Sequence, residues 1–415
     1  MAMNDIMTGA WIFAVVLQSA VGLLLAYPIL LRLASLLGRK NSLPESETTY
    51  DADYAVIVTA YQQADQLPYV IDSILKSGYA NCLIYVVADN CDTSGLAIAD
   101  ERVILLKPER TLANNIKSHF YAIDRFRRDH ERLVIIDSDN LVGRHFFSAL
   151  NAYFDAGYVA VQGVRKAKNM NTAFACLDEA GDMYYRYVDR KLLFETGSSA
   201  SLAGSGMAFT TAIYKECLAA VETEGAGFDK ILQYELVKRD LRIAFAEDAV
   251  VYDEKTAKAD QLVRQRARWI NTWFKFLKLG GRLLVLSFGK LSYNQLAFSV
   301  MLCRPPLFML LSIAGVGVVA NLLAGSAMAI YWLCSIACFI YLFFAAIRYF
   351  DAPRSVYRAI RMIPVFCFYQ VLALFNAKKA NRLSVATQHG WKAAIEELDR
   401  HSRTVDTDYY EKTKN

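Results

Sequence analysis

Hydrophobic and polar positions divide the chain into three parts, and the first part is a long apolar run. Between residues 10 and 31 the only polar side chain of any size is Gln18. A helix rises ~1.5 Å per residue, so this run can cross a hydrocarbon core of ~30 Å. Arg32, Arg39 and Lys40 follow the run and no Lys or Arg precedes it. The positive-inside bias therefore predicts an outward N-terminus and a transmembrane helix over residues 8–37.

A cleaved signal peptide is the alternative for this first run. Signal peptides usually start with a cationic stretch and have a shorter apolar core, and neither feature is present here. We therefore favour the transmembrane helix.

The second part of the chain alternates short apolar runs with amphipathic ones. YAVIVTAY, CLIYVVADN, RVILL and RLVIIDSDN are predicted strands, while LPYVIDSILKSG and NIKSHFYAIDRFRRD have apolar residues at helical spacing. Strands alternating with helices predict an α/β domain with a mainly parallel sheet, which we place at residues 50–280. In such sheets ligands bind at the carboxyl ends of strands. Asp89, Asp137 and Asp139 are expected at such ends.

The third part of the chain is apolar again. Residues 301–348 contain two runs long enough to span a membrane, preceded by an interfacial segment at 281–300. The last run is short, so we expect residues 355–378 to form an interfacial helix, with a third C-terminal span as the alternative. Residues 379–415 are a polar cytoplasmic tail. This layout predicts a multi-pass protein of the inner (plasma) membrane with a cytoplasmic α/β domain.

The composition agrees with this mixed layout. Of 415 residues, 55% are hydrophobic and 13% aromatic, and the mean hydropathy is +0.21. These values are too apolar for an ordinary soluble enzyme and too polar for a transporter built only of helices. The eight cysteines lack the paired spacing of a metal site, so we interpret them as reduced thiols or core fillers. The net charge of +5 suits an anionic membrane surface or ligand, and we expect no nucleic-acid partner.

Two carboxylates end the apolar strand in LVIIDSDN. Side chains at i and i+2 of a strand point the same way, so Asp137 and Asp139 can bind one divalent cation together. Mg²⁺ and Mn²⁺ favour carboxylates together with substrate phosphates, and the ion then neutralises charge on a diphosphate leaving group. An Asx-type turn also favours Asp, Ser and Asn and is the alternative. The motif alone does not decide between them.

Motifs in a fixed order along the chain support the first interpretation. IVTAYQQADQLPYVIDSI, VVADNCDTSG, VIIDSDN, GSGMAF, FDK, DEK and QRARW follow one another. Together they resemble the membrane-bound family-2 glycosyltransferases, which include cellulose, chitin and hyaluronan synthases. The resemblance covers residues 55–276 and the flanking hydrophobic layout. It implies a GT-A fold (Rossmann-like, mainly parallel sheet) that binds a nucleotide-sugar, with a UDP-sugar favoured and Mg²⁺ or Mn²⁺ as cofactor.

The resemblance also implies roles for residues at matching positions. Those expected to bind the donor are Thr59, Ala60, Tyr61, Asp89, Asp137, Asp139, Gln265 and Arg268. Asp89 would accept hydrogen bonds from uracil or ribose, Asp139 would hold the metal, and Arg268 would grip diphosphate oxygens. Trp269 would form one side of the acceptor site, since aromatic faces stack on pyranose rings. A basic helix lying on anionic lipid is the alternative for this last cluster.

The catalytic base is expected at the start of the helix in FDKILQYELVKRD. Direct displacement at the anomeric carbon needs a carboxylate that takes the proton of the acceptor hydroxyl. Relatives usually carry Glu-Asp here, whereas this chain has Phe228 followed by Asp229. We expect Asp229 to be the base and Glu235 to be the fallback, with a simple helix-capping Asp as the alternative. The departure at Phe228 leaves the setting of the base and the type of acceptor open.

Two further motifs carry weaker expectations. Gly204, Ser205 and Gly206 could bring backbone close to the acceptor, although a plain tight turn serves equally well. Near the C-terminus, VATQHG resembles the Thr-x-basic element with which some synthases close over the nucleotide. Thr387 and His389 are the gating candidates.

The remaining basic side chains and histidines are expected to be ordinary. Lys166 and Lys168 are predicted to lie in a solvated loop. His119 has no partner at catalytic or metal spacing, so it is predicted to lie on the surface.

These inferences predict an inverting membrane glycosyltransferase that adds sugar to a growing polysaccharide. The alternative, favoured by the small number of spans, is transfer of one sugar to a lipid or lipid-linked glycan. A catalytically inactive membrane scaffold of a synthase complex is the alternative of another class. The expected partners are a nucleotide-sugar donor, a glycan or lipid-linked acceptor, the lipid bilayer, and a second copy or an export partner.

Overall fold

The computed structural model describes residues 2–38, 51–221, 226–377, 391 and 395–396. The chain divides into two compact units. A helical unit contains residues 1–41, 176–198 and 258–380, and an α/β unit contains the rest of the chain.

The α/β unit is built on a sheet of eight strands within the described residues. Their bounds are β1 Tyr54–Tyr61, β2 Cys82–Asp89, β3 Val103–Leu106, β4 Arg132–Asp137, β5 Leu141–Val142, β6 Ala160–Ala167, β7 Met207–Thr210 and β8 Ala244–Asp253. The spatial order is β3-β2-β1-β4-β7-β6-β8-β5. The first four strands in this order are parallel, β7 is antiparallel to both its neighbours, and β6 and β8 are parallel. The predicted mainly parallel sheet is confirmed.

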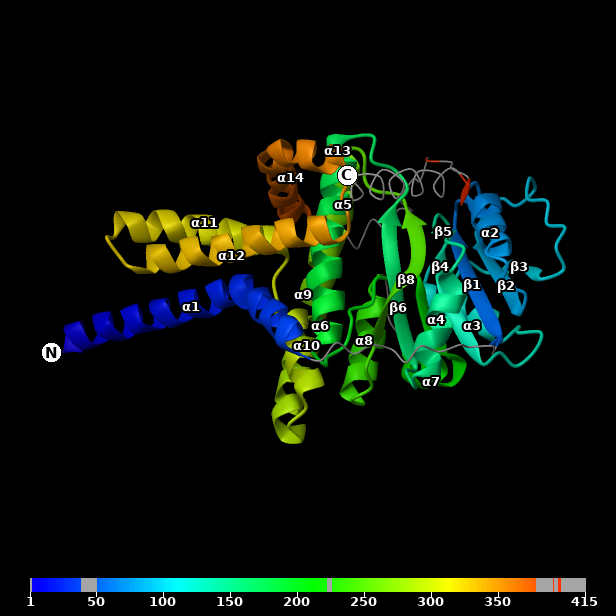
Figure 1. Ribbon diagram of the computed structural model, residues 1–415, viewed down its shortest axis with the longest axis horizontal. Coiled ribbons are helices and arrows are strands. Elements are labelled where there is room, and N and C mark those ends of the chain that lie inside the picture. The colour runs from blue at the N-terminus through cyan, green and yellow to red at the C-terminus, as the bar shows by residue number, and fades with distance from the viewer. Residues whose placement is uncertain (1, 39–50, 222–225, 378–390, 392–394, 397–415) are drawn as a thin grey trace, which may run out of the picture. The chain divides into compact units, whose positions relative to one another are not determined.

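Helices cover this sheet because each has an apolar face (Figure 1). Their bounds are α2 Leu67–Lys76, α3 Asn115–Ile123, α4 Phe146–Asp155, α7 Thr211–Leu218 and α8 Phe228–Lys238. In α2 the buried residues Leu67, Val70, Ile71 and Ile74 recur at helical spacing. The start of α3 is capped by Asn114, whose side chain accepts a hydrogen bond from the backbone of Lys117.

The helical unit contains the long apolar helices. Their bounds are α1 Ala2–Leu37, α5 Ala173–Tyr185, a π-helix Arg186–Leu192, α6 Leu193–Glu195, α9 Ala259–Lys290, α10 Tyr293–Cys303, α11 Leu307–Leu323, α12 Met328–Tyr349, α13 Arg354–Ala359 and α14 Ile363–Asn376. Three described segments are long and apolar enough to cross a membrane: Trp11–Leu37, Met328–Tyr349 and Arg354–Asn376. The helices α10 and α11 make a fourth if the pair, bent by 71°, is counted as one span.

Three of these helices, α1, α11 and α12, pack side by side (Figure 1). Polar groups join them in the apolar interior. The side-chain oxygen of Gln18 accepts hydrogen bonds from Asn321 at 2.6 Å and from the indole of Trp332 at 2.9 Å. Gly317 allows the close approach of α12, because a Cβ there would lie 2.5 Å from the Trp332 indole nitrogen. The one polar side chain noted in the first run therefore fixes the packing of these helices.

Buried ion pairs connect other parts of the helical unit. On the π-helix Arg186–Leu192, every residue is buried. Arg186 pairs with Glu179 of α5 at 3.0 Å, and Asp189 pairs with Arg304 at 2.5 Å. Because an unpaired buried charge is very costly, these partners hold their helices in one arrangement.

Candidate functional site

Three strand ends of the α/β unit bring the predicted donor residues together. In the parallel register, Thr59 of β1 pairs with Asp137 of β4 on one side. On the other side, Tyr61 of β1 pairs with Asp89 of β2. The end of β1 therefore lies between the two acidic strand ends, as the expectation for parallel strands required.

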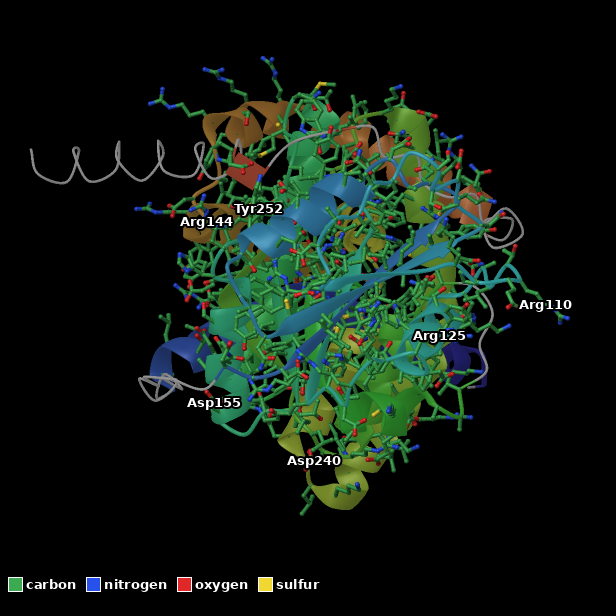
Figure 2. All side chains as sticks on the ribbon, turned by 90° about the vertical axis from the view of Figure 1, so that its right-hand side faces the viewer. Arg110, Arg125, Arg144, Asp155, Asp240 and Tyr252 are labelled. Atoms are coloured by element: carbon green, nitrogen blue, oxygen red, sulfur yellow. The ribbon has the colours of Figure 1, made fainter. Side chains whose placement is uncertain are left out.

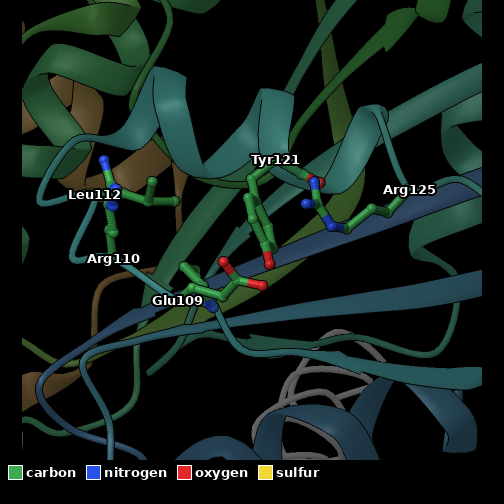
Figure 3. A pocket seen from close by; sticks show the side chains of 6 residues that line it. Glu109, Arg110, Leu112, Tyr121 and Arg125 are labelled. Atoms are coloured by element: carbon green, nitrogen blue, oxygen red, sulfur yellow. The ribbon is translucent and has the colours of Figure 1, made fainter.

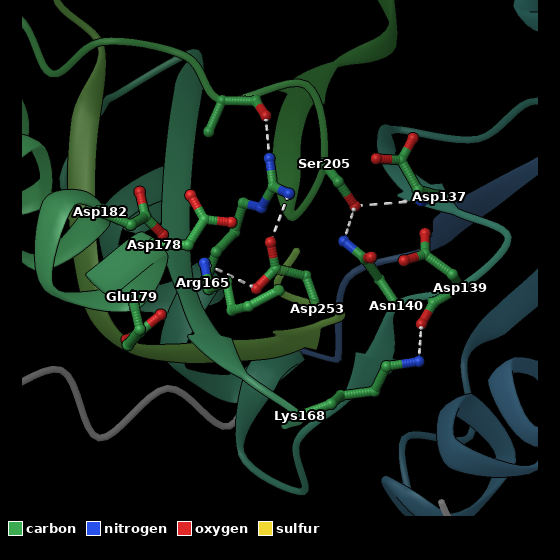
Figure 4. A network of polar contacts seen from close by, with 12 residues as sticks. Asp137, Asp139, Asn140, Arg165, Lys168, Asp178, Glu179, Asp182, Ser205 and Asp253 are labelled. Carbon is green, nitrogen blue, oxygen red and sulfur yellow. Dashed lines mark hydrogen bonds and ion pairs between the residues drawn. The ribbon is translucent and has the colours of Figure 1, made fainter. Parts of the chain in front are cut away.

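The turn after β4 is supported by the serine of the GSG motif. The hydroxyl of Ser205 accepts hydrogen bonds from the backbone N–H of Asp137 at 3.0 Å and from the side-chain amide of Asn140 at 2.8 Å (Figure 4). Gly204 and Gly206 flank this serine with φ angles of +88° and +65°, which favour glycine. The loop thus lies against the acidic turn, and its contact with an acceptor stays a prediction.

Negative charge is concentrated around Asp137. Burial, and then the nearby carboxylates of Asp139, Asp253 and Asp229, raise the pKa of Asp137 to about 7, while Arg165 acts in the opposite direction. Asp139 is itself 8% exposed. A divalent cation would relieve this repulsion, and carboxylate oxygens are the ligands that Mg²⁺ and Mn²⁺ favour.

The described residues do not form a complete metal cage. Within them, no three Asp, Glu, His or Cys side chains are placed to hold an ion together. Magnesium sites of phosphate chemistry commonly use one or two carboxylates and take further oxygens from the substrate and from water. The carboxylates after β4 therefore fit a metal that is shared with a diphosphate.

Basic groups neutralise the neighbouring end of β8. Arg165 contacts Asp253 at 2.5 Å and also donates to the carbonyl oxygen of Ala203 (Figure 4). Lys255 contacts the other carboxylate oxygen of Asp253 at 3.0 Å. Arg165 lies in no recognisable local motif, and Asp253 begins the DEK motif, whose pairing with Arg165 no local pattern predicts.

The expectation that Lys168 lies in a solvated loop is wrong. Its side chain is buried, and its ammonium group donates to the backbone carbonyl of Asp139 at 2.5 Å (Figure 4). Burial lowers the pKa of Lys168, and the neighbouring carboxylates of Asp139, Glu254 and Asp253 act in the opposite direction. Lys166, two residues earlier, is exposed as expected, but it lies in β6 and not in a loop. Lys168 was missed because its partner is a backbone atom that no sequence pattern identifies.

Asp89 organises the loop that follows β3. Its two carboxylate oxygens accept hydrogen bonds from the backbone N–H groups of Leu112 at 2.9 Å and Ala113 at 2.7 Å. The side chain is only 2% exposed, and Ala113 has a left-handed φ of +46°. Asp89 therefore shapes the loop that leads into α3, whereas its contact with a nucleotide stays a prediction.

The two candidates for the catalytic base have different surroundings. Asp229 is the second residue of α8, is partly buried, and is one of the charges that raise the pKa of Asp137, so it lies near the acidic site. Its neighbour Lys230 lies 3.4 Å away. The fallback, Glu235, pairs with Arg239 at 2.5 Å further along the helix. The surroundings of Asp229 favour it as the base.

The Q-x-x-R-W motif lies on α9 of the helical unit. Trp269 is 51% exposed, which is unusual for so large an apolar ring. The guanidinium of Arg266 lies 4.1 Å from the centre of this ring and is ion-paired with Asp178. Gln265 and Arg268 are on the same helix, and burial lowers the pKa of Arg268. The gating candidates Thr387 and His389 lie outside the described residues.

A shallow cavity of about 210 Å³ lies along the loop after β3. Its lining consists of Pro108, Glu109, Arg110, Leu112, Tyr121 and Arg125 (Figure 3). Arg125 stacks on the Tyr121 ring at 3.6 Å. Figure 2 shows Arg110 and Arg125 well apart from Tyr252, the neighbour of Asp253. The cavity is therefore separate from the β8 end of the acidic site.

The expectation that His119 lies on the surface is also wrong. Its side chain is fully buried, and its Nδ1 lies 2.6 Å from the hydroxyl of Tyr214. Its ring packs edge-on against Phe228, at 5.0 Å between centroids. Spacing along the chain could not reveal this contact, because its three members come from three different helices.

Comparisons with known proteins agree with this geometry. The profile of a family described as "Glycosyltransferase like family 2" matches residues 52–272. No curated protein matches the chain significantly in sequence.

Among solved structures, the chain is similar to the mannosyltransferase PcManGT from Pyrobaculum calidifontis in complex with GDP-Man and Mn²⁺. The TM-score is 0.54 and the identity 16%, covering 87% of this chain and 99% of that chain. It is less similar to TarS 1-349 of S. aureus, with a TM-score of 0.41 and 14% identity over 80% of this chain and 90% of that one. The predicted GT-A fold is confirmed.

Proposed function

Because the chain belongs to the family-2-like glycosyltransferases, we propose that it transfers sugar from a nucleotide-sugar, with inversion, to a growing polysaccharide. The observation that carries this proposal is the gathering of Asp139, Asp229 and Asp253 around Asp137, whose pKa is raised to about 7 by burial and by these carboxylates. Such perturbed groups at strand ends are typical of functional sites.

Mg²⁺ or Mn²⁺ is the cofactor that this site would fit. Asp139 would hold the ion, and the ammonium group of Lys168 keeps the backbone of Asp139 in place. When bound, the ion supplies positive charge that stabilises the diphosphate leaving group. The presence of GDP-Man and Mn²⁺ in the structural neighbour supports this assignment.

The donor would lie across the ends of β1, β2 and β4. Thr59, Ala60 and Tyr61 would flank the nucleotide base, and we favour a UDP-sugar. Asp137 would contact the nucleotide. Asp89 would contact the base or ribose directly, or would present the loop at Leu112 that it holds. These contacts would orient the anomeric carbon for attack.

The Q-x-x-R-W motif of α9 is assigned to the donor and the acceptor. Arg268 and Gln265 lie three positions apart, so they share a helix face, and the guanidinium would grip diphosphate oxygens. The exposed ring of Trp269 would stack on the acceptor sugar. The loop at Ser205 would bring backbone near the acceptor.

Proton removal is assigned to Asp229. Its carboxylate would accept the proton of the attacking acceptor hydroxyl as the new glycosidic bond forms. The bond to the diphosphate breaks on the opposite face of the sugar, so configuration inverts. The ion pair of Glu235 with Arg239 makes that residue a poorer base.

The helical unit would place the enzyme in a membrane. The three apolar segments are long enough to span, and we infer a multi-pass protein of the inner (plasma) membrane with the α/β unit in the cytoplasm. The exposed ring of Trp269 favours a polysaccharide acceptor, because a sugar chain can stack on it. Transfer of one sugar to a lipid or lipid-linked glycan is the competing function, favoured by the small number of spans.

The test is nucleotide release by detergent-purified protein with Mn²⁺, over a panel of UDP-, GDP- and dTDP-sugars, followed by sizing of the product. We expect turnover with one donor, its loss in D139N and D229N, and its retention in E235Q. A long product supports the polysaccharide acceptor, whereas a single added sugar refutes it. Retained turnover in D229N would overturn the assignment of the base, and failure of the wild-type protein to bind any nucleotide would favour a scaffold.

A further inference from the structure

A histidine that the proposed reaction does not use contacts Phe228, the residue before the proposed base. His119 of α3 is fully buried. Tyr214 of α7 and Phe228 of α8 enclose its ring, and both are themselves buried. Asp229 follows Phe228 in the chain. The three side chains thus connect three helices.

The hydrogen bond of this group orients the imidazole. Burial raises the pKa of Tyr214 well above its usual range, so its hydroxyl keeps a proton that it can donate to Nδ1 of His119, 2.6 Å away. Burial also lowers the pKa of His119 to about 3, so the ring stays neutral. The remaining proton then lies on Nε2, which has no hydrogen-bond partner among the described residues.

The Phe228 ring packs against the imidazole. The two rings meet at 70° with centroids 5.0 Å apart, which is an edge-to-face contact between buried side chains. The aromatic residue at this position therefore packs on His119 without burying a further charge.

The start of α8 lacks a side-chain cap within the part of the chain that the structure describes. Its N-cap is Gly227, with a φ of +106°. The first N–H groups of a helix lack partners within the helix, so an uncapped first turn frays easily. Phe228 is the first residue of this turn and is 6% exposed. Its packing on His119 thus determines where the turn begins.

We propose that Phe228, held by the pair of His119 and Tyr214, is a positioning residue that fixes the carboxylate of Asp229 toward the acceptor. This inference rests on the proposed function, because it takes Asp229 as the base.

The test compares truncations of two buried residues of α8 in the full-length protein, using the donor that gives turnover. F228A removes the contact with His119, whereas L232A removes a fully buried side chain one turn later and leaves that contact intact. We expect F228A to lower kcat by about 10- to 100-fold with little change in donor KM, because small misplacements of a reacting group cost this much. We expect F228L, which restores apolar volume, to recover most of kcat.

The outcomes separate this inference from the proposed function. Equal loss of kcat in F228A and L232A, at equal loss of Tm, would show general loosening of the helix and overturn the inference alone. A rise in donor KM without loss of kcat in F228A and F228L would also overturn it. Wild-type kcat in D229N would refute the base, and the inference with it. If F228A does not fold, Y214F, which removes only the hydroxyl that holds His119, is expected to lower kcat, and wild-type kcat in Y214F would overturn the inference.

Discussion

The buried ammonium group of Lys168 donates a hydrogen bond to the backbone carbonyl of Asp139, at 2.5 Å. This bond joins the end of β6 to the turn that carries the proposed metal ligand. A charged hydrogen bond of this kind is worth about 1.5–3 kcal/mol. Its function would be to keep the Asp139 carboxylate in one place.

We predict that K168M weakens Mn²⁺ binding by about tenfold, which corresponds to about 1.4 kcal/mol, because the turn loses its anchor. Titration calorimetry with Mn²⁺ in the presence of the nucleotide measures this directly. K166M is the matched control, since Lys166 is exposed and lies two residues before Lys168, within β6. Equal affinities in the two variants would contradict the anchoring role.

Asp89 should act through the loop it holds. In D89N one of the two acceptors for the N–H groups of Leu112 and Ala113 becomes a donor, so one hydrogen bond is lost. We expect donor KM to rise about tenfold, with kcat changed much less, since one charged hydrogen bond is at stake. D92N is the control, because the exposed carboxylate of Asp92 bonds only its own local turn at Ser94. A fall in kcat at constant KM would count against this role.

Two glycines of α11 should respond differently to the same substitution. A Cβ at Gly317 would lie 2.5 Å from the indole nitrogen of Trp332, which is buried and bonded to Gln18. A Cβ at Gly315 would meet nothing within 4 Å. We predict that G317A destabilises the protein by about 1–3 kcal/mol through overpacking, whereas G315A does not. Thermal unfolding in detergent compares them, and equal Tm values would refute the described packing.

His119 should make stability depend on pH. The pKa of His119 is about 3 in the folded protein and 6.5 in the unfolded chain. Below pH 6.5 the unfolded state therefore binds a proton that the folded state does not bind. Stability from this group is therefore complete above pH 6.5 and is lost as pH falls toward 3, by about 1.36 kcal/mol per pH unit at most.

The comparison with H119Q isolates this contribution. The Tm difference between the wild-type protein and H119Q should be constant from pH 7 to 8.5 and should change steadily below pH 6.5. A difference that stays constant down to pH 5 would show that His119 does not titrate as its burial requires.

Much of this protein was determined by the local pattern of its sequence. Alternation of apolar strands and amphipathic helices is a property of neighbouring residues, so it predicted the parallel sheet and the acidic ends of β2 and β4. Long apolar runs likewise predicted α1 and α12, because membrane length is counted in residues. The position of Asp229 followed from a motif on one helix.

Tertiary structure alone decided which side chains surround these motifs. Lys168, Arg165 and His119 meet partners on other elements, and each contact is long-range in sequence. The periodic spacing of apolar residues does not encode such long-range contacts, and the sequence alone does not show whether a Lys or His is buried or exposed. Burial and backbone acceptors, which exist only after folding, gave Lys168 and His119, two side chains expected to be ordinary, contacts next to the proposed metal ligand and the proposed base.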